Sequence, residues 1–238
     1  MDGFFEKFSV YDFFNLLASG IIFLLGLIAL GLLELTTLAD FLSTNTEMQW
    51  VLFILILGGC YLIGTIFQQI GSIAFERRYS NGITSTILCN RYSVLTNQIK
   101  LEVHQKYARM LFQAKGIPFE GDCFSGWHCE YYFAYCSYYI QNQNKHHKAE
   151  KMRGLKGIYS LLVTCFALLC IISLVRVAFA VADSESYLYF MGIACVYLAL
   201  LIIYVRAYKE NTKYWVRMVL GVYEACVDID MREKNKEF

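Results

Sequence analysis

Residues 50–78, WVLFILILGGCYLIGTIFQQIGSIAFERR, decide the fold of this chain, because 26 positions pass without a charged side chain before Glu76, Arg77 and Arg78. A helix of about 20 apolar residues is long enough to cross the hydrocarbon core of a bilayer. The stretch therefore predicts a transmembrane helix. Glycines and the adjacent amides Gln68 and Gln69 interrupt its apolar surface, so the amides need a structural or functional explanation.

Three further stretches have the same character, at residues 16–33, 157–175 and 187–205. The chain has 238 residues, of which 57% are hydrophobic and 17% charged. A soluble protein with so much apolar surface would need more polar helix faces to cover it than this sequence supplies. We therefore predict an all-α membrane protein with four transmembrane helices.

The N-terminal segment 1–15 differs from a signal peptide. Its acidic residues Asp2, Glu6 and Asp12 outnumber its one basic residue, Lys7, and the apolar stretch that follows is longer than a typical signal-peptide core. We expect the first span to be retained. The aromatic residues of the segment recur at roughly helical spacing, which favours a short helix in the membrane interface.

Lysine and arginine are distributed unevenly around the spans. The loops 34–49 and 182–186 contain neither residue, whereas 76–156 and 206–238 hold 19 of the 21 basic residues. The positive-inside rule places these two basic segments in the cytoplasm, together with both termini. The predicted organisation is an interfacial segment (1–15), two spans (16–75), a cytoplasmic helical insert (76–156), two more spans (157–205) and a cytoplasmic helix and tail (206–238).

The cytoplasmic segments predict long helices that pack into a bundle. Residues 93–116 predict a helix with Gly116 at its C-terminal end before Pro118. Its apolar stripe is formed by Ile99, Val103, Tyr107, Met110 and Leu111. Residues 127–157 are rich in tyrosine and predict one continuous helix that runs into the third span. One face of it, formed by Tyr132, Cys136, Tyr139 and Gln143, is expected to pack against other helices. The fourth span is expected to continue in the same way into the C-terminal segment.

The sequence contains no recognisable catalytic motif, and we expect neither an enzyme nor a cofactor. No GxxxxGK[ST], GxSxG or HExxH pattern is present. Cys123, His128, Cys129 and Cys136 resemble a zinc set in composition, but they lack the closely spaced cysteine pairs of structural zinc sites. We therefore predict that they serve helix packing and that the chain has no metal site.

The polar residues of the second span have two possible roles. Gly64, Gln68, Gly71 and Phe75 recur on one helical face near its cytoplasmic end, with Gln69 and Ser72 beside it. Small residues allow helices to approach closely, and amides can form hydrogen bonds between helices. Alternatively, several copies assemble around an axis and this polar face lines a pore. These six residues are the pore-lining candidates.

The basic residues of the insert are compatible with an anionic ligand, although lysine and arginine beside a membrane are also expected for topology and for lipid headgroups. The candidates fall into two clusters. They are Arg77, Arg78, Arg91, Lys100, Lys106 and Arg109 in the first, and Lys145, His146, His147 and Lys148 in the second.

The order of YDFFNLLASGIIFLLGL, YLIGTIFQQIGSIAFERR, a basic helical insert and a second pair of spans resembles a family of bacterial effectors. These are the small four-transmembrane effector proteins of anti-phage systems, of the Hailong-type or CBASS-like kind or the CRISPR-associated kind. The resemblance covers nearly the whole chain in layout. It implies a homo-oligomeric channel in the bacterial inner membrane, for example a tetramer, that depolarises the infected cell.

The resemblance also implies partners. The gating signal would be a nucleotide or oligonucleotide from a nucleotidyltransferase, or a soluble defence protein. An alternative function is a non-conducting membrane sensor or scaffold, which recruits a soluble defence protein through its cytoplasmic helical bundle.

Overall fold

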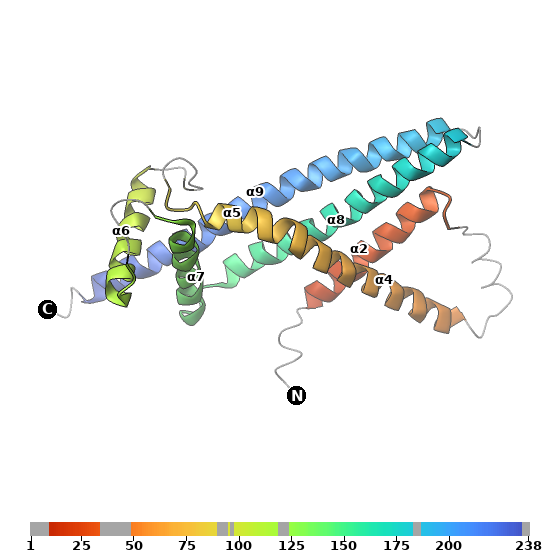
Figure 1. The fold of residues 1–238 in the computed structure, drawn as a ribbon. Helices are drawn as coiled ribbons and strands as arrows, with labels where there is room; N and C mark the ends of the chain where they lie inside the picture. The colour runs from red at the N-terminus through yellow and green to blue at the C-terminus, as the bar shows by residue number, and fades with distance from the viewer. Residues whose placement is uncertain are drawn as a thin grey trace. The chain divides into compact units, whose positions relative to one another are not determined.

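The computed structural model describes residues 10–33, 49–89, 95, 98–118, 124–182 and 187–234, and every regular element in these ranges is a helix. The order is shown in Figure 1. The elements are α2 (Val10–Ala29), α4 (Gln49–Gly71), the π-helix η2 (Ser72–Ser80), α5 (Asn81–Thr84), α6 (Gln98–Lys115), α7 (Gly126–Asn142), α8 (His147–Ala182) and α9 (Tyr187–Lys234). The predicted all-α class is confirmed for the part of the chain that the structure describes.

The chain divides into two compact units. The first, here called the apolar unit, comprises residues 1–73 and 157–208, and the second, here called the aromatic unit, comprises residues 74–156 and 209–238. Helix α8 has 36 residues and helix α9 has 48. Because they are so long, each contributes residues to both units.

Three helices of the described chain are long and apolar enough to cross a membrane, which is compatible with a membrane protein. They contain residues Gln49–Phe75, His147–Ala182 and Tyr187–Asp228. The first predicted span corresponds to a shorter apolar helix, Phe13–Ala29, within α2. The predicted interfacial segment and the loop 34–48 lie mostly outside the described residues.

In the apolar unit, α2 and α4 cross at a pair of glycines. A Cβ atom on Gly20 would collide with the carbonyl group of Cys60, and one on Gly64 would collide with the carbonyl group of Leu16. The two contacts are reciprocal. Gly20 lies four residues after Leu16, which meets Gly64, and Gly64 lies four residues after Cys60, which meets Gly20. The helix backbones therefore touch without intervening side chains, as small residues permit in membrane helices.

Helix α8 packs against the same pair of helices. Leu169 of α8 fills the space beside Gly26, and the hydroxyl of Ser160 lies where a Cβ on Gly71 would be. The Tyr197 hydroxyl of α9 donates a hydrogen bond of 3.0 Å to the Gly26 carbonyl oxygen. The core of this unit thus forms where glycines allow four helices to meet; its buried apolar residues are Leu16, Leu30, Phe67, Leu161, Cys165, Phe166, Leu169 and Tyr197.

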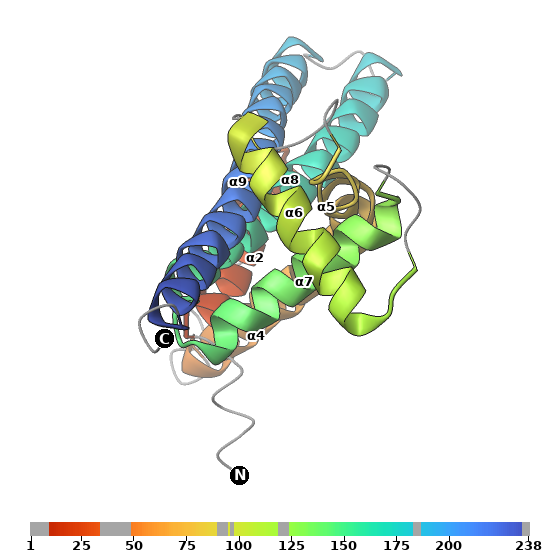
Figure 2. The same cartoon turned by 90° about the vertical axis from the view of Figure 1, so that its left-hand side faces the viewer.

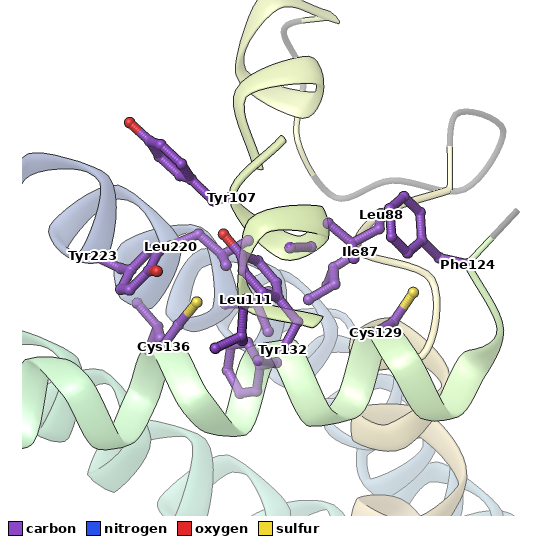
Figure 3. Packing of buried hydrophobic residues seen from close by; sticks show 14 of the residues in the cluster. Ile87, Leu88, Tyr107, Leu111, Phe124, Cys129, Tyr132, Cys136, Leu220 and Tyr223 are labelled. Atoms are coloured by element: carbon purple, nitrogen blue, oxygen red, sulfur yellow. The ribbon is translucent and has the colours of Figure 1, made fainter. Parts of the chain in front are cut away.

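The core of the aromatic unit lies between α6, α7 and α9 (Figures 2 and 3). Tyr132 and Cys136 of α7 are fully buried there and meet Leu220 and Tyr223 of α9. The Tyr132 and Tyr223 rings are nearly perpendicular, with centroids 5.9 Å apart, which is a favourable edge-to-face arrangement. The tyrosine-rich segment thus packs helices together, as predicted for Tyr132 and Cys136.

The end of α6 follows the prediction from its sequence. The helix ends at Lys115, and Gly116 adopts a φ of 64°. The Ile117 amide donates to the Phe112 carbonyl oxygen at 2.9 Å, a hydrogen bond typical of the Schellman motif. A residue without a Cβ is favoured at this left-handed position.

The prediction of one continuous helix from residue 127 into the third span is wrong. Helix α7 ends at Asn142 and α8 begins at His147, with Asn144 between them at a φ of 54°. The Lys145 amide donates to the Ile140 carbonyl oxygen at 3.0 Å, which again closes a helix end. Asparagine tolerates the left-handed conformation better than most residues, so the sequence QNQN encodes a turn.

Candidate functional site

The structure separates the six pore-lining candidates of α4 and η2 into two sets. Gly64 and Gly71 are buried in the contacts with α2 and α8. Gln68 and Gln69 are exposed, while Ser72 and Phe75 are half-buried in η2. The glycines therefore serve helix packing, and the amides face away from the helices of their own unit.

Gln68 shares its side of α4 with polar residues that the sequence interpretation missed. Tyr61, Thr65 and Gln68 follow one another at intervals of four and three residues, so they lie on one side of the helix. The Thr65 hydroxyl donates to the Tyr61 carbonyl oxygen at 2.9 Å. We call Thr65, Gln68 and Gln69 the polar stripe. The signal that could have found Thr65 is its spacing from Gln68.

Large apolar side chains flank the polar stripe. Leu62, Ile66 and Ile70 are exposed at 64%, 56% and 40% of their surface, respectively. Helix α4 therefore has three faces, namely a glycine seam against α2 and α8, a polar stripe, and an uncovered apolar face. The last of these is the type of surface that lipid covers.

The first basic cluster is not gathered at one point among the described residues. Lys100 lies 4.0 Å from the Glu224 carboxylate, Lys106 is exposed, and the Arg109 guanidinium stacks over the Phe124 ring at 5.9 Å. Lys100 and Arg109 are nine positions apart, which corresponds to about 13 Å along α6. The side chains of Arg77 and Arg78, and the whole of Arg91, lie outside the described residues.

Glu224 also faces a buried histidine. The His104 ring is inaccessible to solvent, its Nδ1 lies 2.9 Å from the Tyr132 hydroxyl, and its Nε2 lies 3.9 Å from a Glu224 oxygen. Burial lowers the pKa of His104 to about 4, and the nearby Lys100 ammonium lowers it further in the same direction. A carboxylate at 3.9 Å would raise this pKa, but desolvation of the ring outweighs it because Glu224 itself is partly exposed to water.

The depressed pKa of His104 predicts a loss of stability in acid. An unfolded histidine titrates near 6.5, so the unfolded chain binds a proton before the folded chain does. Stability from this residue is fully present above about pH 6.5 and falls as the pH drops toward 4, by up to about 3 kcal/mol. Thermal denaturation of the detergent-solubilised chain between pH 7 and 4 measures this. His104→Leu should show a smaller pH dependence than the wild type, and equal pH dependence would contradict the assignment.

The second basic cluster is held together by the turn between α7 and α8. The His146 and His147 rings lie side by side, with centroids 4.8 Å apart, and His146 Nε2 is 3.5 Å from the Glu150 carboxylate. Lys145 and Lys148 are exposed on either side of them. The turn at Asn144 thus brings together the two histidines and an acidic residue that the sequence interpretation did not include.

Lys145 also lines a groove of about 520 Å³ on α9. A second basic residue, Arg217, lies on the same groove, and its remaining walls are mainly apolar: Tyr214, Met218, Gly221, Val222, Ala225 and Cys226. The sequence interpretation did not select Arg217. The small residues Gly221 and Ala225 leave this space open on α9. Their spacing of four residues is the sequence signal that could have predicted the groove.

The residues considered for zinc lie in packed surroundings where the structure describes them. Cys129 and Cys136 are fully buried, and burial raises the pKa of Cys129 to about 12. The His128 Nδ1 accepts from the Ser125 amide at 3.3 Å and so helps to cap α7. Cys123 lies outside the described residues. Protonated, buried thiols are poor metal ligands, because the thiolate is the ligand.

Comparisons with protein-family models, with curated proteins and with solved structures returned no match for this chain.

Proposed function

We propose that this chain is an oligomeric, channel-like effector in the inner membrane of a bacterium, and that it permeabilises this membrane in anti-phage defence under the control of a nucleotide signal or a partner protein. In this proposal α2, α4 and the parts of α8 and α9 in the apolar unit form four transmembrane helices. The aromatic unit and both termini are cytoplasmic.

The lengths of the helices and the distribution of charge support this topology. The 20 residues of α2 rise by about 30 Å, which equals the thickness of the hydrocarbon core. Lysine and arginine are concentrated in the segments assigned to the cytoplasm, as the positive-inside rule requires. The resemblance to four-transmembrane defence effectors supplies the biological context of the proposal.

The observation that carries the channel proposal is the exposure of the two amides of the polar stripe, Gln68 and Gln69. Gln68 lies eight residues before Glu76, the first charge after the span, so it is about 12 Å inside the span along the helix. An amide without a partner costs about 4–8 kcal/mol in a medium that cannot form hydrogen bonds. Because Gln68 and Gln69 are exposed in the single chain, water in a pore or a neighbouring copy must satisfy them.

Several copies arranged around an axis satisfy this requirement. The polar stripe of each copy then faces the axis, the exposed apolar face of α4 turns toward lipid, and the glycine seam holds α4 on its own α2 and α8. The groove with Lys145 and Arg217 supports control by an anionic ligand, because it combines an apolar wall with two cationic side chains.

The same groove favours the alternative function. A non-conducting sensor or scaffold would use this surface of the aromatic unit to bind a soluble defence protein, and Gln68 and Gln69 would then form hydrogen bonds between copies. Ion flux distinguishes the two functions, because the alternative requires none.

We expect the purified chain to carry ions when it is reconstituted into planar bilayers or liposomes, and we expect Gln68→Glu to increase its preference for cations over anions. A carboxylate on a pore wall attracts cations, whereas the volume of the side chain is unchanged. Gln113→Glu is the matched control, because it introduces the same change at an exposed position on α6 of the aromatic unit. The reversal potential under a salt gradient measures the preference.

The outcomes separate the parts of the proposal. Absence of flux in bilayers, together with an unchanged membrane potential in expressing cells followed with a voltage-sensitive dye during phage challenge, would reject the channel. Flux with the same ion preference in the wild type and in Gln68→Glu would reject the polar stripe as the pore wall and leave the channel proposal in place.

A further inference from the structure

Two imidazoles and a carboxylate converge at the start of α8. His147 and Glu150 lie three residues apart in the first turn of this helix, and His146 precedes it directly. One potential ligand atom from each of the three side chains lies within 4.8 Å of the other two. Nitrogen and oxygen donors in this combination are typical ligands of Zn²⁺ and of neighbouring transition metals.

The distances already approach those of a metal site. In a tetrahedral zinc site with bonds of about 2.0–2.1 Å, neighbouring ligand atoms are about 3.3 Å apart. His146 Nε2 and Glu150 Oε2 are separated by 3.5 Å. His147 is exposed, so rotation of its side chain can bring its ring into the same coordination sphere without moving the helix.

The second ring nitrogen of His146 is consistent with a ligating histidine. The Nδ1 atom of His146 is shielded from solvent and has no hydrogen-bond partner among the described residues. A metal ion held between Nε2 and the Glu150 carboxylate leaves Nδ1 to donate the outer hydrogen bond by which a ligating histidine is oriented, and a water molecule can accept it. Beside it is a cavity of about 60 Å³ lined in part by His146, Glu150 and Arg153, which is large enough for an ion or a water molecule.

The surrounding positive charges do not outweigh this arrangement. Lys145, Lys148 and Arg153 are exposed to solvent, and in water a divalent ion at 4 Å from a single positive charge is repelled by about 2 kcal/mol. All three side chains are long and can turn away. The free energy of zinc binding is about 10–16 kcal/mol in sites with four protein ligands. We expect a site with three protein ligands to keep a binding free energy larger than the repulsion by these cations.

We propose that His146, His147 and Glu150 bind a divalent transition-metal ion, with Zn²⁺ as the natural candidate and water completing its coordination. The ion would join the turn at Asn144 to the first turn of α8 and so fix the direction in which that helix starts. This inference does not depend on the channel proposal, because it concerns residues of the aromatic unit alone.

Metal titration of the full chain in detergent, in a buffer without chelators, tests the site with Co²⁺ and Zn²⁺ as probes. We expect one equivalent of Co²⁺ to bind with the weak visible absorption of nitrogen and oxygen ligands, and Zn²⁺ to displace it. His147→Ala and Glu150→Gln should each weaken the binding about tenfold or more. Both residues are exposed, so these variants should fold, and circular dichroism checks that they do.

Glu102→Gln is the matched control, because Glu102 is an exposed carboxylate on α6 that does not belong to the proposed ligand set; it should bind metal as the wild type does. Absence of binding, or equal binding by the wild type and by both site variants, would overturn the proposal. Strong sulfur-to-metal absorption would also overturn it, since it would assign the metal to the cysteines.

Discussion

Gly64→Leu is expected to prevent stable packing of α2 against α4. A Cβ at position 64 would collide with the Leu16 carbonyl oxygen, which belongs to helix backbone and cannot turn aside. Overpacking a close contact costs about 1–3 kcal/mol and occasionally more, and a collision with backbone belongs to the upper end. We expect a loss of about 3 kcal/mol, which lowers the melting temperature by about 6–12 °C. Thermal denaturation in mild detergent measures this.

Gly58→Leu is the matched control for this substitution. Gly58 lies on the same helix, and a Cβ there would meet nothing within 4 Å. The control should therefore melt close to the wild type. Equal melting temperatures for the two variants would show that close packing of α2 on α4 does not stabilise the chain. That result would contradict the assignment of Gly64 to helix packing.

Tyr132→Ala is expected to destabilise the aromatic unit by a similar or larger amount. The ring is completely buried and touches side chains of α6 and α9, and its hydroxyl lies 2.9 Å from His104 Nδ1. Removing a buried aromatic ring costs about 3–5 kcal/mol. The measurement is the melting temperature of the full chain, together with near-ultraviolet circular dichroism, which reports the packing of the tyrosines.

Tyr132→Phe separates the two contributions of this residue. It keeps the ring and removes only the hydroxyl, so it should cost about 1–3 kcal/mol by leaving His104 Nδ1 without its partner. Tyr138→Ala is the surface control, because Tyr138 is 63% exposed on the same helix. A loss in Tyr132→Ala no greater than in Tyr138→Ala would contradict the assignment of Tyr132 to the core.

Part of the aromatic core could be predicted from helical spacing, and part could not. Tyr107, Leu111, Tyr132 and Cys136 lie on the predicted stripes and are buried. Met110 was placed on the same stripe of α6 but is 52% exposed, whereas His104 is fully buried. A polar histidine is not expected in a core, and it is accommodated there because Tyr132 of another helix supplies a hydrogen-bond partner. Such a partner cannot be identified from one helix alone.

The candidate sites show the same division. The spacing of α4 identified Gln68 and Gln69 as residues that need an explanation, but it grouped them with Gly64 and Gly71. The structure assigns Gly64 to a backbone contact with α2 and Gly71 to a contact with the Ser160 hydroxyl of α8, and it leaves the amides exposed. The cause is geometric: a periodicity of three and four residues defines a face, and only the neighbouring helices determine which edge of that face is covered.

The sequence by itself determined the helical class, the apolar helices and the concentration of basic residues, because these follow from the number and period of apolar and charged side chains along the chain. The tertiary structure alone decided the reciprocal contact of Gly20 and Gly64 and the burial of His104 beside Tyr132. Each of these depends on atoms brought together by the packing of helices, and the energy of such contacts depends on distances of a few tenths of an ångström, which residue spacing does not encode.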